Sequence, residues 1–205
     1  MKNLWISTIA VIWLSGCATT INQAELDDVV KNKKGGIVVV GTEGKSMGVA
    51  SLLGQVSDKS SPSIDIQTAS DDGKNISLSL IWSNPYSGKI QDGYAVMFLP
   101  ENKAGETYVI SRYNAGGLYS HHLAALCKGR ETLTFKVKNG DVLYLGHYSI
   151  EITSQTYNSV RWSISRKNDL DAAKAYVTKT FPMVVGEIKP ATLEPRIPDD
   201  GAGCN

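Results

Sequence analysis

The chain has 205 residues, of which 42% are hydrophobic and 20% are charged, and its formal net charge at pH 7 is +1. This composition is typical of an ordered globular domain and excludes a disordered or wholly membrane-embedded chain. The charge is too small to steer the protein to nucleic acid, and the length suffices for one domain with a hydrophobic core.

The first sixteen residues have the layout of a removable export signal. Lys2 supplies a positive charge, and a mostly apolar run of eleven residues extends from Leu4 to Leu14. A membrane-spanning helix needs about 20 apolar residues, so this run is too short to remain as a transmembrane helix. We therefore predict a signal peptide over residues 1–16 and a mature chain that begins at Cys17, with a formal net charge of zero once Lys2 is lost.

The end of the apolar run, Leu14-Ser15-Gly16-Cys17, resembles the lipobox of bacterial lipoproteins. The resemblance implies diacylglycerol on the Cys17 thiol, cleavage before this residue by the lipoprotein signal peptidase, and acylation of the new amino terminus. Several acyl chains hold a protein to a bilayer almost permanently, because each buried methylene contributes roughly 0.8 kcal/mol. Ala18, where inner-membrane lipoproteins usually carry Asp, points to the outer membrane and a domain that faces the periplasm. The alternative is an ordinary secretory signal that contains a cysteine.

Residues 17–35 read as a tether between the anchor and the folded domain. Asn22 and Glu25 have the spacing of a helix cap, so a short helix is predicted there. The lysines that follow fit a solvated linker or contact with anionic lipid head groups.

A compact β-branched run at 37–40 predicts a strand, and residues 44–48 after it fit the pattern G-x-S-x-G, with Ser46 at its centre. In hydrolases with this pattern the serine lies on a tight turn between a strand and a helix, and an acid such as Asp92 and a histidine base follow in the chain. The candidate bases are His121, His122 and His147. We favour a flexible glycine loop, since three residues separate the strand from the motif and alternating strand–helix units are absent. An exported serine hydrolase is the alternative.

Neither a phosphate-binding loop nor a metal site is expected. Two residues intervene between Gly41 and Gly44-Lys45-Ser46, where a phosphate loop needs four. The adjacent His121 and His122 point to opposite faces of a strand, so they cannot easily share one metal ion. We predict no cofactor.

From Gly36 onward, short strands separated by turn signals are expected. Alternation of apolar and polar residues predicts strands over 76–82, 107–113 and 160–165, and the apolar run 94–99 predicts another. The clearest element is a hairpin with a type I′ turn at Asn139-Gly140, in which Phe135 faces Tyr144 across the pair. Tyrosines near predicted turns offer an alternative function, the binding of glycan or peptidoglycan. They are Tyr86, Tyr113, Tyr119 and Tyr157.

With Cys17 assigned to lipid, Cys127 and Cys204 form an even pair in an oxidising compartment, and we predict a disulfide between them. Two free thiols are the alternative. Asn168 begins a predicted amphipathic helix over 168–181 that ends before Pro182, and residues 186–205 read as an extended, irregular tail because of their prolines.

The expected fold class is mainly β: an antiparallel β-sandwich over 36–185 with one C-terminal amphipathic helix. The segment from Leu99 to Gly146 resembles small envelope lipoproteins with a transthyretin-like or prealbumin-like sandwich, through Leu-Pro, Ala-Gly and Tyr at 99–108 and Phe-x-Val-x-x-Gly-x-x-Tyr-x-Gly at 135–146. An insertion at 101–103 departs from that pattern. The resemblance implies a fold and no activity. Together these features predict a non-enzymatic, lipid-anchored module that binds an envelope protein or glycan.

Overall fold

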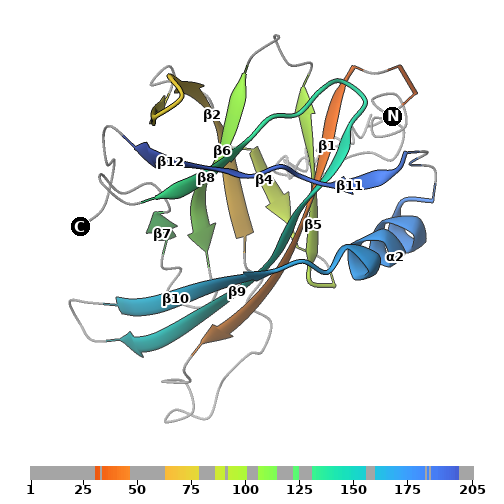
Figure 1. Ribbon diagram of the computed structural model, residues 1–205. Helices are drawn as coiled ribbons and strands as arrows, with labels where there is room; N and C mark the ends of the chain where they lie inside the picture. Colours follow the sequence, from red (N-terminus) through yellow and green to blue (C-terminus); the bar gives the residue numbers. More distant parts are fainter. Residues whose placement is uncertain are drawn as a thin grey trace, which may run out of the picture.

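The computed structural model describes residues 31–32, 34–46, 63–78, 86–90, 92–100, 106–114, 122–124, 131–155, 160–182, 184 and 186–198. Within these ranges the protein is mainly β, with twelve strands in two sheets and one helix, α2 (Leu170–Thr180) (Figure 1). Lys31 and Asn32 are helical, and the rest of the short helix predicted from Asn22 lies outside the described residues.

Sheet A has five strands, with β9 at its centre. One edge of β9 pairs with β1, and the other edge pairs with β11 near its start and with β10 further along. The strands in order are β10 (Val160–Lys167), β9 (Val142–Gln155), β1 (Gly35–Ser46) and β5 (Tyr94–Pro100), with β11 (Ile188–Pro190) beside the start of β9. Pairing of β9 with β1 and with β11 is parallel.

Sheet B has seven strands, and its pairings close into a ring through β2, β3, β12, β8 and β6. Its members are β2 (Ser63–Asp71), β3 (Asn75–Leu78), β4 (Tyr86–Lys89), β6 (Thr107–Asn114), β7 (His122–Ala124), β8 (Thr132–Phe135) and β12 (Glu194–Pro198). Pairing of β12 with β3 is parallel. The prediction of a purely antiparallel fold is therefore wrong for three strand pairs, whose members are joined by long connections as parallel pairs require.

Both faces of sheet A are buried, which explains the continuous apolar run in β1. Val38 and Val40 join one core cluster with residues of sheet B such as Ile64 and Ile66. Ile37 and Val39 face the other way, into a second cluster with Ala173 and Val177 of helix α2. A strand covered on both sides has no polar face, so it loses the alternating pattern.

A β-bulge in β9 sets which side chains face each cluster. Leu143 and Leu145 lie in the core between the sheets, and after the register shift at Gly146 the same core receives Tyr148 and Ile150. Gly146 has φ of +117°, a conformation that glycine adopts readily. The bulge thereby turns His147 toward the helix side of the sheet, in the same row as Gly41 and Tyr94.

The predicted hairpin at 133–148 is wrong, although its turn exists. The Asp141 N–H donates to the Lys138 carbonyl, but only Gly140 of the two central residues has positive φ, whereas a type I′ turn needs both. The turn instead holds the start of β1, since Gly140 N donates to the Gly35 carbonyl and Ile37 N to that of Asp141. As a result β8 and β9 belong to different sheets.

The end of the chain is extended, as predicted, but two of its segments are strands within the sheets. β11 continues sheet A and β12 closes the ring of sheet B, so residues 188–198 cross from one sheet to the other (Figure 1). The prediction of a helix near 168–181 is confirmed, with Asp169 at the N-cap position in place of Asn168. Phe181 follows its last residue, and Pro182 comes next.

Candidate functional site

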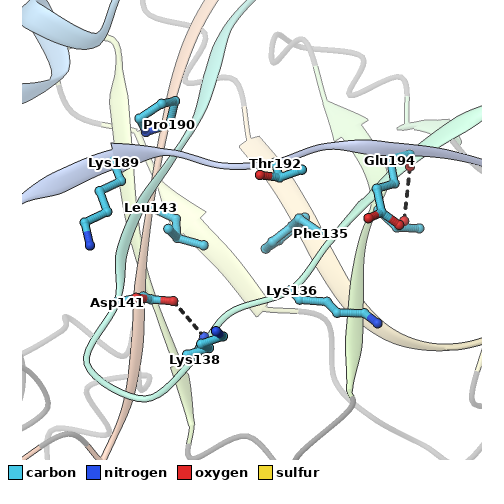
Figure 2. A pocket seen from close by; sticks show the side chains of 10 residues that line it. Phe135, Lys136, Lys138, Asp141, Leu143, Lys189, Pro190, Thr192 and Glu194 are labelled. Carbon is cyan, nitrogen blue, oxygen red and sulfur yellow. Dashed lines mark hydrogen bonds between the residues drawn. The ribbon is translucent and has the colours of Figure 1, made fainter.

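A cleft of about 320 Å³ lies where the chain crosses twice between the sheets (Figure 2). One crossing is residues 136–141, which join β8 to β9, and the other is residues 191–193, which join β11 to β12. Pairing of β11 with β9 and of β12 with β8 fixes the two crossings on either side of the opening. The Ala191 N–H adds a bond of 2.9 Å to the Tyr144 carbonyl.

The floor of the cleft is the edge of the core between the sheets. Phe135 and Leu143 line it and are 2% and 8% exposed. Phe135 stacks on Tyr108 with ring centroids 5.8 Å apart, which restrains the aromatic floor from below. Exposed Pro190 adds an apolar wall, so the cleft offers a small, rigid apolar surface below a polar rim.

Three lysines give the rim its positive charge. Lys136 and Lys138 are exposed and alternate with buried Val137, so the extended chain places both on the outer side of the first crossing. Lys189 lies opposite Leu143 in the β11–β9 register, and Figure 2 shows its side chain beside Leu143 at the cleft. The three ammonium groups therefore come from two segments about fifty residues apart.

The two carboxylates in the lining are engaged within the protein. Asp141 Oδ2 accepts the Lys138 amide at 2.9 Å, and Glu194 Oε2 lies 2.6 Å from Arg196 Nη2. Arg196 Nε also bonds Asp71 Oδ1 at 2.9 Å, which ties β12 to the end of β2. Burial alone raises the pKa of Asp71, but the bonds from Arg196 and the Gly73 amide outweigh burial and lower this pKa below its ordinary value.

A second group of polar side chains lies between sheet A and helix α2. The rings of His147 and Tyr94 meet edge to face at 5.7 Å above Gly41, and Tyr94 stacks on Tyr176 of the helix at 4.8 Å. Neither imidazole nitrogen has a hydrogen-bond partner within the described structure. Burial, followed by the nearby Lys167 charge, lowers the pKa of His147, so the ring stays neutral at pH 7.

Tyr144 completes this second group. Its hydroxyl is buried near the Asp169 amide without a hydrogen bond of good geometry, and burial raises its pKa to about 12. A neutral imidazole and an un-ionised phenol packed against rings act as core side chains.

The structure separates Ser46 from His147, one of the three candidate bases. Ser46 is the last residue of β1, opposite Ile152, whereas His147 lies opposite Gly41, about 16 Å of strand earlier. Asp92, with φ of +51°, and Gly93 form a turn before β5. The expected glycine loop is wrong in part, because residues 44–46 continue the strand.

Several predicted residues cannot be placed by the structure. Cys17, Cys127, Cys204, His121, Tyr119 and Tyr157 lie outside the described residues. The backbone positions of His122, Tyr86 and Tyr113 are strand positions in sheet B, and their side chains are not described. No three His, Cys, Asp or Glu side chains in the described ranges gather as metal ligands.

Sequence reasoning missed the lysine rim. Lys136 and Lys138 show the spacing of one strand face, but nothing in the sequence links them to Lys189. Comparison with family models, with curated proteins and with solved structures finds no match to this chain. Over the part of the chain that is described, no helix has the length and apolar character needed to cross a bilayer.

Proposed function

We propose that this protein is an exported lipoprotein, anchored by acyl chains on Cys17 to the outer membrane and facing the periplasm. Its folded domain is a non-enzymatic binding module, and the cleft between the two crossings is its binding surface. The support for the anchor is the lipobox resemblance at 14–17 that follows an apolar run of export-signal length.

We further propose that the two sheets form a β-sandwich of the transthyretin-like or immunoglobulin-like kind. The observation in favour is a single cluster of buried side chains to which both sheets contribute, including Met97 of sheet A and Ile110 of sheet B. Helix α2 covers the opposite face of sheet A. Such a scaffold holds loops and crossings rigidly, which suits recognition of a partner.

The observation that carries the binding role is the cleft itself. Its frame consists of paired strands and its floor is closed by the core, so the opening is preformed. Preformed, concave sites with a few convergent polar groups are the usual form of small-ligand sites. The separation of Ser46 from His147 along the strands favours binding over the hydrolase alternative.

The anchor is tested by replacing Cys17 with Ala in the full-length chain and fractionating cells that express it. We expect the natural protein to be recovered with the outer membrane and the variant to be lost from that fraction. Intact mass spectrometry of the natural protein should show an acylated first residue at Cys17. Thr20→Ala is the matched control, since it changes the tether without touching the lipobox or the predicted disulfide.

Two results would contradict the anchor. One is an unmodified residue at position 17 in the purified mature protein. The other is recovery of Cys17→Ala in the outer membrane at the level of the natural chain.

A further inference from the structure

We propose that the cleft between residues 136–141 and 191–193 binds a phosphate-bearing ligand. This inference rests on the proposed function, because it names the ligand class for the same binding surface. Three lysines line one opening, yet within the described residues none of their ammonium groups forms an ion pair with a carboxylate. Unpaired cations around a concave site raise the local concentration of anions.

The neighbouring acids do not cancel this charge. Asp141 uses one oxygen for the Lys138 amide, and Glu194 is turned to Arg196. Figure 2 shows the Asp141 contact at the base of the first crossing and Glu194 at the far end of the second, away from Lys189. In the described part of the chain, the lining therefore presents three lysines without an ion pair and two carboxylates that already have partners, and the charge of Lys136 also acts on Asp71.

The type and placement of the cations favour phosphate over a single carboxylate. Arginine is the side chain that pairs a carboxylate in two-pronged geometry, whereas lysine acts as a point charge, suited to phosphate oxygens that point in several directions. Lys136 and Lys138 lie on one crossing and Lys189 on the strand that leads into the other. Figure 2 shows Lys189 and Lys136 at opposite ends of the opening, so a ligand that reaches both must carry negative oxygens in more than one place, as a molecule with phosphate groups does.

The size and floor of the cleft limit the rest of the ligand. A volume of about 320 Å³ is at the lower end of small-molecule sites. It admits a phosphate with a small attached group beside Phe135 and Pro190, and any longer chain must lie outside the cleft. A phospholipid head group and a soluble phosphate ester share this chemistry, so the test must separate the two sources.

The test uses the full mature protein in a neutral detergent, at low ionic strength, with calorimetric titration of two probes. One probe is inorganic pyrophosphate, and the other is phosphatidic acid dispersed in the same micelles. We compare the natural protein with a triple variant in which Lys136, Lys138 and Lys189 are replaced by Gln. The matched control replaces three lysines elsewhere, Lys74, Lys174 and Lys179, with Gln.

We expect binding that weakens by about two- to five-fold for each cleft lysine removed, and thus by roughly ten- to one-hundred-fold in the triple variant, because partly exposed ion pairs are each worth this much. The control should bind as the natural protein does. Binding of pyrophosphate alone identifies a soluble phosphate ester, and tighter binding of phosphatidic acid identifies a lipid head group. Thermal unfolding of both variants checks that the fold is kept.

The inference fails if neither probe binds the natural protein, or if the control loses as much affinity as the cleft variant. Should the cleft variant fail to fold, backbone amide shifts of 136–143 and 189–194 on adding pyrophosphate to the natural protein decide the question, and unmoved amides overturn the site. An unacylated Cys17 with intact phosphate binding would overturn the proposed anchor and leave the site standing.

Discussion

The missing side chain at Gly41 decides how the aromatic rings pack between sheet A and helix α2. Gly41 lies between Tyr94 of β5 and His147 of β9 in the strand register, and the two rings meet above it. A Cβ built at Gly41 would overlap the His147 imidazole. The glycine is therefore a packing requirement of the row, and its role does not depend on an unusual backbone conformation.

We predict that Gly41→Ala lowers the free energy of unfolding by about 1–3 kcal/mol, the usual cost of overfilling a packed site. Denaturant unfolding measures the loss. In the double variant with His147→Ala, the ring that the new methyl meets is gone, so the effect of the alanine should shrink in a double-mutant cycle. Fully additive losses, or a Gly41→Ala protein as stable as the natural one, would contradict this packing.

At the scale of elements, local sequence pattern predicted several of the strands but not all of them. The runs at 107–113 and 160–165 match β6 and β10, and the 94–99 run matches β5. β2 was missed, although Ile64 and Ile66 alternate with polar residues there. The hairpin prediction failed because strand partners are chosen by tertiary contacts: at the start of β9 one edge pairs with β1 and the other with β11, so neither is left for β8.

The C-terminal segment shows the same limit of prediction from local sequence pattern. Pro190 and Pro198 read as breaks in structure, yet each is the last residue of a short strand, where a missing N–H costs little. The lysine rim depends on tertiary pairing too: Lys189 reaches the cleft only through the pairing of β11 with β9. Local sequence pattern therefore could not predict the rim.

We expect strand β12 to be essential for the ring of sheet B. A chain that ends at Leu193 loses the pairing with both β8 and β3, as well as the bonds of Arg196 to Asp71 and Glu194. The loss should be about 1 kcal/mol for each backbone hydrogen bond removed. Chemical denaturation in a reducing buffer measures it, so that the predicted Cys127–Cys204 bond does not vary between samples.

The matched control is a chain that ends at Pro198, which keeps all of β12. In the reducing buffer this control should remain more stable than the chain that ends at Leu193. Equal stability of the two truncated chains would mean that β12 contributes nothing to the fold.

For the whole molecule, two groups far apart make stability depend on pH in separate windows. Burial, then the charge of Lys167, lowers the pKa of His147, while Glu43 and Asp169 act in the opposite direction. The unfolded chain then takes up a proton at this histidine before the folded protein does. The contribution of neutral His147 to the free energy of unfolding is therefore fully present above about pH 6.5. It is lost as the pH falls from there toward the lowered pKa of the folded state.

Asp71 affects the free energy of unfolding at lower pH. Its folded pKa is lowered, on balance, by Arg196 and Gly73 against the effect of burial, so its contribution is present above about pH 4 and is lost as the pH falls further. The ion pair is partly solvated, so this contribution is about 1 kcal/mol or less.

We predict that His147→Gln flattens the dependence of the unfolding free energy on pH just below about pH 6.5 and leaves the part below pH 4 unchanged. Asp71→Asn should do the reverse, with lower stability at pH 7 and a flatter profile in strong acid. Denaturant unfolding across the pH range separates the two, because His147 lies in sheet A, Asp71 lies in sheet B, and different charged groups act on each. If His147→Gln keeps the slope of the natural protein just below pH 6.5, another group titrates there, and this imidazole does not cause the loss of stability in mild acid.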